Sequence, residues 1–102
     1  MIEYSKDNLK QLKTIGENAP AAMQGFQALS KAAFDEGALP KKVKELIAVA
    51  VAISKECPYC MDIHAASARK AGATDEELAE ASMVAAAIGA GAAVTHATHA
   101  FA

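Results

Sequence analysis

The sequence predicts an all-α fold: a single domain over residues 1–102, with about six helices, that assembles into an oligomer. Alanine makes up about a quarter of the chain, and other helix-forming residues supply much of the rest. β-branched residues do not alternate with polar ones over any long stretch, as they would in a half-buried strand. Proline and glycine stand where helices begin and end, so short connections are expected.

Two helices are expected in the N-terminal third of the chain. Ser5 is a suitable N-cap for the first, which should run to a break near Gly16. Pro20 suits the first turn of the second helix, and Gly37 should end it. The apolar positions of this second helix follow amphipathic spacing: Met23, Phe26, Leu29, Ala33 and Phe34.

A third helix is predicted to open at Pro40 and to continue through "KKVKELIAVAVAISKE". From Leu46 to Ile53 it is apolar on every face, which is typical of a helix that is buried all round. Glu45 is the last charged residue before this run. Its carboxylate is therefore expected to pack inside and to require a partner, although a solvated position at the helix start is the alternative.

The fourth helix should begin at Cys57 and Pro58, because proline at the first helical position loses no hydrogen bond. It should run to about Ala71, where Gly72 suits the left-handed residue that follows a helix.

A fifth helix should begin after Thr74. Thr74 and Glu77 have the spacing of a capping box, and three acids fill the first turn, where the helix dipole favours them. Residues 88–93, "IGAGAA", are expected to separate this helix from a last one that ends near Phe101.

The alanine content bears on assembly. Alanine buries little apolar area, and one buried CH₂ is worth only about 0.8 kcal/mol. Large apolar residues supply only about another quarter of the chain, and a small domain buries a modest fraction of its surface. We therefore expect a homo-oligomer in which subunits add core to one another.

Charge and hydropathy exclude several classes of protein. The net charge of −2 and the 5% aromatic content argue against a nucleic-acid partner. The N-terminal "MIEYSKDNLKQLK" mixes charges, unlike a signal peptide. No apolar run is expected to approach the roughly 18 residues that span a bilayer. We therefore expect a cytoplasmic protein without a membrane partner, in a compartment where thiols stay reduced.

The only two cysteines lie in "ECPYCMDIHA", residues 56–65. At 100° per residue, Cys57 and Cys60 lie about 60° apart on the fourth helix, and His64 falls between them. Cys60 and His64 are neighbours at i, i+4. The three side chains therefore face one direction from the first two turns of the helix.

This arrangement is suited to thiol chemistry. A thiolate is the nucleophile, a nearby histidine can take its proton, and a helix N-terminus favours the charged form. A second cysteine can condense with an oxidised one to form a disulfide. Cys60, next to His64, is the candidate attacking thiol, and Cys57, nearer the exposed helix start, is the candidate resolving thiol. If the third and fourth helices pack antiparallel, Glu45 could orient His64.

The stretch "KELIAVAVAISKECPYCMDIH" resembles the alkyl hydroperoxidase D-like (carboxymuconolactone decarboxylase) family. The redox branch of that family carries a Glu, eleven residues, and then Cys-x-x-Cys-x-x-x-His, which Glu45, Cys57, Cys60 and His64 match. The similarity covers roughly residues 38–102. Tyr59 departs from the best-studied peroxidase of the family, which has a histidine between the cysteines.

The resemblance implies an all-helical fold that assembles as a trimer or hexamer, and an enzyme that reduces small hydroperoxides. In that scheme Cys60 is peroxidatic, Cys57 is resolving, and Glu45 and His64 relay protons. No bound cofactor or metal is implied. An external dithiol, such as a lipoyl group on a partner protein, would reduce the disulfide. The lactone decarboxylase branch lacks the cysteine pair, so its reaction is not expected here.

Two alternatives remain open at this stage. The chain could be a non-catalytic helical oligomer, a binding or interaction protein with a regulatory thiol pair. It could also be a zinc-binding module, in which Cys57, Cys60 and His64 need a fourth ligand. His96 and His99 could supply that ligand, bind metal themselves at i, i+3 spacing, or lie at a surface or interface.

Overall fold

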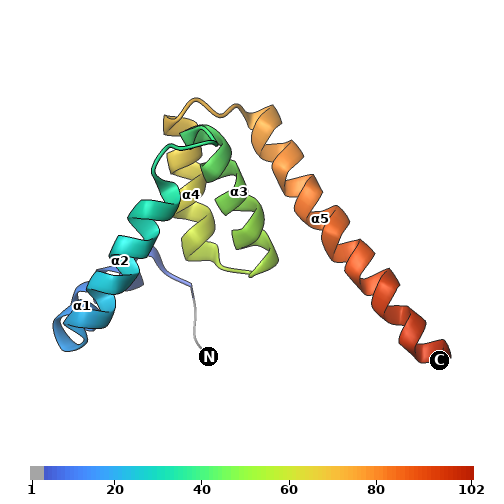
Figure 1. Ribbon diagram of the computed structural model, residues 1–102, viewed down its shortest axis with the longest axis horizontal. Coiled ribbons are helices and arrows are strands. Elements are labelled where there is room, and N and C mark those ends of the chain that lie inside the picture. The colour runs from blue at the N-terminus through green and yellow to red at the C-terminus, as the bar shows by residue number, and fades with distance from the viewer. Residues whose placement is uncertain (1–3) are drawn as a thin grey trace. The chain divides into compact units, whose positions relative to one another are not determined.

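The computed structural model describes residues 4–102, and every regular element among them is helical (Figure 1). The predicted all-α fold is confirmed. The elements in order are η1 (Lys6–Gln11, 3₁₀), α1 (Leu12–Asn18), α2 (Pro20–Phe34), α3 (Lys41–Ser54), α4 (Pro58–Lys70), α5 (Asp75–Ala97) and η2 (Thr98–Phe101, 3₁₀). The chain divides into a first compact unit that ends at Lys41 and a second unit, Lys42–Ala102. The prediction of a single domain over 1–102 stays a prediction.

The first unit begins with a capped helical turn. The Ser5 side chain accepts a hydrogen bond from the Asp7 N–H, so the predicted N-cap is confirmed. The predicted break near Gly16 is wrong, since α1 continues to Asn18 and the chain turns at Ala19. Proline disfavours helical backbone in the residue before it, so Pro20 sets the position of the break.

Helix α2 starts with Pro20 in its first turn, as predicted, and ends at Phe34 rather than at Gly37. Asp35 adopts an extended backbone and so stops the helix. The Lys41 Nζ then donates to the Phe34 carbonyl and lies 5.1 Å from the centre of its ring.

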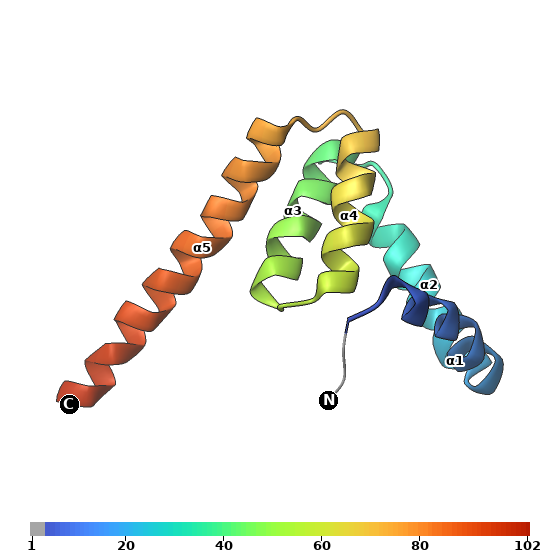
Figure 2. The same cartoon turned by 180° about the vertical axis from the view of Figure 1, so that it is seen from behind.

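In the second unit, α3 and α4 lie side by side and antiparallel (Figure 2). The buried core contains one residue of α3, one of α4 and two from the chain that follows: Val49, Ala68, Ala73 and Leu78. Helix α3 is not buried all round, because Ile47 and Val51 are about half exposed. Within one chain, α4 covers one side of α3 and leaves the other open.

Helix α4 ends in a Schellman turn. The N–H groups of Gly72 and Ala73 return to the carbonyls of Arg69 and Ala68, at 3.0 and 2.9 Å. Gly72 has φ 97°, as the sequence predicts for the residue after this helix.

Helix α5 begins with the predicted capping box. The Glu77 N–H donates to the Thr74 hydroxyl at 3.1 Å, and the Thr74 N–H donates to the Glu77 carboxylate at 2.9 Å. The interruption predicted at 88–93 is wrong, because α5 runs unbroken through Gly89 and Gly91 to Ala97. Each glycine costs only about 1 kcal/mol relative to alanine, and the alanines around them keep the helix favourable.

Residues 75–101 also contain an 18-residue window with a mean hydropathy of 1.5, long and apolar enough to cross a membrane by length and composition. The expectation that no apolar run approaches this length is therefore wrong. A helix that packs against other protein can have the same length and hydropathy, so these two properties do not place the helix in a membrane. Within this chain, only Leu78 and Ala85 of α5 are buried.

Candidate active site

The turn between α3 and α4 fixes the backbone of the first cysteine. The Cys57 N–H donates to the Ala52 carbonyl at 3.0 Å, and the Glu56 N–H donates to the Ile53 carbonyl at 3.1 Å. These two bonds form a Schellman turn like the one after α4. Glu56 has φ 53° and takes the left-handed position that glycine usually occupies. Cys57 therefore directly follows a non-glycine residue in a left-handed conformation.

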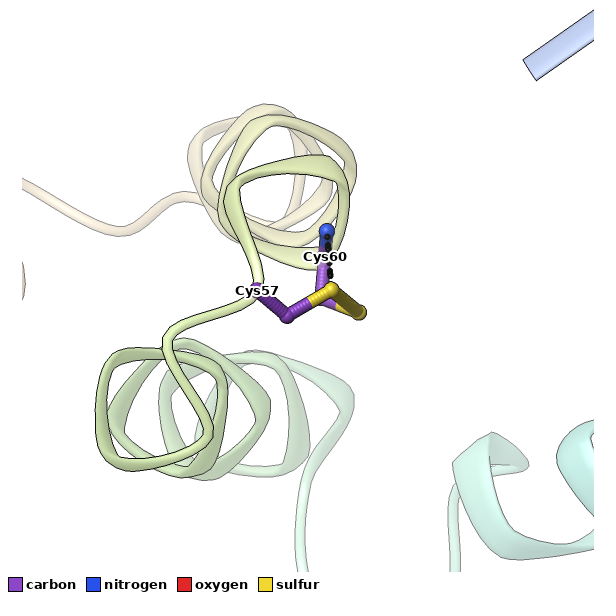
Figure 3. Close-up of a disulfide and its surroundings, with 2 residues drawn as sticks. All are labelled: Cys57 and Cys60. Atoms are coloured by element: carbon purple, nitrogen blue, oxygen red, sulfur yellow. Dashed lines mark hydrogen bonds between the residues drawn. A yellow bond between two sulfur atoms is a disulfide. The ribbon is translucent and has the colours of Figure 1, made fainter. Parts of the chain in front are cut away.

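Cys57 also starts the next helix. It is the N-cap of α4, and its Sγ accepts a hydrogen bond from the Cys60 N–H at 3.2 Å (Figure 3). Pro58 follows in the first turn. One residue thus closes α3 through its N–H and caps α4 through its sulfur. A sulfur at this position lies at the positive end of the helix dipole, which stabilises a thiolate.

Cys57 and Cys60 form a disulfide, with a Cα–Cα separation of 5.3 Å (Figure 3). This separation falls within the usual range for disulfides. Both residues are partly buried. The first turn of α4 can therefore hold the pair in its oxidised form.

The structure brings Glu45 and His64 together, although they are 19 residues apart in the sequence. Glu45 is 3% exposed, and one of its carboxylate oxygens lies 2.8 Å from Nδ1 of His64. The expectation that Glu45 packs inside is confirmed, and the solvated alternative is wrong. A neutral His64 that donates from Nδ1 to this carboxylate keeps Nε2 as a proton acceptor.

His64 and Cys60 lie one turn apart on α4, so they share a face of the helix. The side chain of His64 is about one quarter exposed, while that of Glu45 is almost fully covered. The Glu45 carboxylate therefore lies deeper than the His64 imidazole, and the cysteine pair lies at the start of the same helix as His64.

The residues proposed for a zinc site are not assembled. Among residues 4–102, no group of three or more His, Cys, Asp or Glu side chains is placed to hold a metal ion. The sulfurs of Cys57 and Cys60 are bonded to each other. His96 and His99 contact each other at the end of α5, with ring centres 6.0 Å apart.

Sequence reasoning missed two features near the site. Glu56 was assigned no role, because nothing in its local sequence signals a left-handed conformation. The local sequence also does not indicate a partner for Lys42, whose ammonium lies 2.9 Å from the Glu77 carboxylate and ties the start of α3 to the start of α5. This hydrogen bond from Lys42, with that from the Thr74 backbone, holds the pKa of Glu77 below its usual value.

Comparisons with known proteins show which family the chain belongs to. The sequence profile of the carboxymuconolactone decarboxylase family matches residues 20–102. An uncharacterised protein of the cox locus of Paracoccus denitrificans is 47% identical over 91% of this chain and 86% of its own length. An uncharacterised protein of Cupriavidus necator is 48% identical, over 70% of this chain and 63% of its own length.

Two solved structures are similar in fold. A carboxymuconolactone decarboxylase family protein from Legionella pneumophila has a TM-score of 0.78 and 42% identity, over 91% of this chain and 83% of that one. A protein from Methanobacterium thermoautotrophicum has a TM-score of 0.80 and 40% identity, over 84% of this chain and 97% of that one. The chain therefore belongs to the carboxymuconolactone decarboxylase family.

Proposed function

We propose that this protein is a thiol-dependent oxidoreductase that reduces small hydroperoxides through Cys57 and Cys60. The observation that carries the proposal is the disulfide at the start of α4, one turn from a histidine that is hydrogen-bonded to a buried carboxylate. Reversible oxidation requires two sulfurs within bonding reach, and peroxide reduction requires a proton donor for the leaving oxygen.

The reaction proceeds in three steps. The Cys60 thiolate attacks one peroxide oxygen, the O–O bond breaks, and the other oxygen leaves with a proton as the alcohol. Cys60 is then a sulfenic acid. The Cys57 thiol then attacks the Cys60 sulfur and releases water, which forms the disulfide. Oxidation of two thiols to one disulfide supplies the two electrons that reduce one peroxide. An external dithiol restores both thiols by two exchange reactions and is itself oxidised to a disulfide.

His64 is proposed to carry the protons of this cycle. It lies at i, i+4 from Cys60, so it can take the thiol proton and deliver it to the departing oxygen. Glu45 acts through His64, as a positioning residue: its hydrogen bond to Nδ1 fixes the orientation of the ring. The low exposure of Glu45 strengthens this interaction, because little water competes with it.

Cys57 is proposed to resolve the sulfenic acid and to exchange with the reductant. Its sulfur caps α4, where the helix N-terminus stabilises a thiolate leaving group. We propose a dithiol reductant, such as a lipoyl group on a partner protein, because a second thiol in the same molecule completes the exchange without a third reactant.

Peroxide consumption in the presence of dihydrolipoamide tests this function. Cys60→Ser should abolish turnover with the dithiol, whereas Cys57→Ser, tested without any reductant, should consume about one equivalent of peroxide and stop at a sulfenic acid. The two variants are matched, since each replaces one sulfur by oxygen in the same turn of helix. Full peroxide consumption by Cys60→Ser would contradict the proposal.

A thiol titration supplies a second test of the same chemistry. Reduced protein should lose two thiols per chain after one equivalent of peroxide, and mass spectrometry should find Cys57 joined to Cys60. Loss of thiols through bonds between chains would mean that the pair does not act within one subunit.

A homo-oligomer is also part of the proposal. Met83, Val84 and Ile88 are each more than 60% exposed within the chain, and from Met83 to Val94 α5 is apolar on all sides. A helix of this composition is normally covered by other protein. The trimer or hexamer that the sequence resemblance implies would cover it.

A further inference from the structure

The end of α5 brings two histidines together. Helix α5 ends at Ala97 and the chain continues as the 3₁₀ helix η2, Thr98–Phe101. The N–H and the hydroxyl of Thr98 both bond to the Thr95 carbonyl, which tightens the last turn. His96 lies in the last turn of α5 and His99 follows three residues later in η2. Their rings are 6.0 Å apart, centre to centre, with 71° between their planes.

Within a single chain, both imidazoles are accessible to a ligand. His96 and His99 are exposed, and among residues 4–102 their contact is with each other rather than with a hydrogen-bond or ion-pair partner. By contrast His64, the other histidine of the chain, is bonded to Glu45. No site described above uses either ring.

The surrounding electrostatics favour a cation at this position. No Lys or Arg follows Lys70 in the sequence, so no nearby residue of the same segment repels a positive ion. The pair also lies in the last turns of a long helix, where the carbonyl groups give a partial negative charge.

We propose that His96 and His99 form a binding site for one divalent transition-metal ion, of the class Cu²⁺, Ni²⁺ or Zn²⁺, with water in the remaining positions. Neutral imidazole is a preferred ligand for these ions. A metal–imidazole bond is roughly 2.1 Å long, so the two rings, 6.0 Å apart, must rotate toward each other to share one ion. Two ligands do not make a closed structural zinc site, so binding is reversible and exchangeable.

Titration of untagged, oxidised protein with NiCl₂ in a calorimeter tests the site. Oxidation matters because the Cys57–Cys60 disulfide removes thiolates as competing ligands. One Ni²⁺ should bind per chain, and His96→Asn and His99→Asn should each weaken binding at least about tenfold, since even a change outside the ligand shell can cost that much. Cu²⁺ should bind more tightly than Ni²⁺, and Mn²⁺ more weakly.

A spectroscopic arm locates the ion independently of the variants. Paramagnetic Ni²⁺ should broaden the imidazole NMR signals of His96 and His99 and leave those of His64 sharp, so His64 is an internal control. Circular dichroism of both variants should be unchanged, because the replaced rings are exposed. Unaltered Ni²⁺ affinity in both variants, or broadening centred on His64, would overturn the proposal. Neither result depends on whether the thiol pair reduces peroxides.

Discussion

At the level of single residues, the contact between Glu45 and His64 depends most on burial. A carboxylate that is 3% exposed has lost nearly all its water, and the 2.8 Å contact with the His64 ring compensates for that loss. Because water does not compete for the buried carboxylate, its interaction with His64 is strong, and this interaction orients the imidazole.

We expect Glu45→Ala to lower the free energy of unfolding by about 2 kcal/mol, since it removes the carboxylate that bonds the His64 Nδ1 and opens a small cavity. Glu45→Gln keeps the volume and an acceptor oxygen for Nδ1, so it should lose less stability. Urea unfolding of the oxidised proteins measures both. If Glu45→Gln retains stability yet shifts the pH profile of peroxide turnover, the carboxylate charge acts in the reaction; identical profiles would limit Glu45 to a structural role.

Glu56 and Gly72 offer a second comparison at this scale, because each holds the left-handed position of a Schellman turn. A side chain in this conformation costs roughly 1–2 kcal/mol. Glu56→Gly should therefore raise the free energy of unfolding by about 1 kcal/mol, after the greater freedom of glycine in the unfolded chain is subtracted.

The reverse change is the control. Gly72→Ala should destabilise the protein by about 1 kcal/mol, and an added Cβ there meets no atom within 4 Å, so the effect arises from the backbone alone. Thermal unfolding should show a higher Tm for Glu56→Gly and a lower Tm for Gly72→Ala than for the wild type. If Glu56→Gly destabilises instead, the Glu56 side chain makes a stabilising contact that outweighs its backbone cost.

At the level of elements, the start of α5 is held by a capping box and by Lys42 of α3. Thr74→Ala should lower stability by about 1 kcal/mol, the usual loss when a threonine N-cap is removed. Ser82→Ala, further along the same helix, is a suitable control because its hydroxyl bonds a carbonyl of its own helix. Equal losses in denaturant unfolding would show that the cap has no special role.

The pH dependence of this helix start follows from Glu77. Its pKa is held below the usual value in the folded protein by Lys42 and the Thr74 backbone. A lowered folded pKa stabilises the protein above the ordinary glutamate pKa, roughly 4.3, and this contribution disappears as pH falls through the lower folded value. The Tm difference between wild type and Glu77→Gln should therefore be present at pH 6 and shrink at pH 3. If the Tm difference between wild type and Glu77→Gln is the same at pH 6 and pH 3, the ion pair with Lys42 does not cause it.

At the level of the whole molecule, the second unit buries few large side chains, while much of its apolar surface lies on α5. Light scattering should therefore give a mass that is a multiple of 10.5 kDa. Ile88→Lys, which introduces a charge at a residue 70% exposed in the single chain, should shift the mass toward the monomer. Lys10→Glu, a charge change in η1, is the control. A monomeric wild type at micromolar concentration would contradict the assembly.

Local signals in the sequence were sufficient for most helix boundaries and for the face that carries the cysteines. Proline at residues 20 and 58, the Thr74–Glu77 box and Gly72 act through atoms no more than five residues apart, so the sequence predicts them directly. The break predicted at 88–93 failed because glycine opposes a helix only weakly when alanine surrounds it.

The sequence by itself determined that the chain is helical and that Cys57, Cys60 and His64 share the first turns of one helix, because both follow from local periodicity. Only the tertiary structure decided that Glu45 reaches His64 across 19 residues, because that contact requires α3 and α4 to pack antiparallel. It also decided which side of α3 is buried and that Glu56 takes a left-handed conformation, since both follow from how the chain turns between two packed helices.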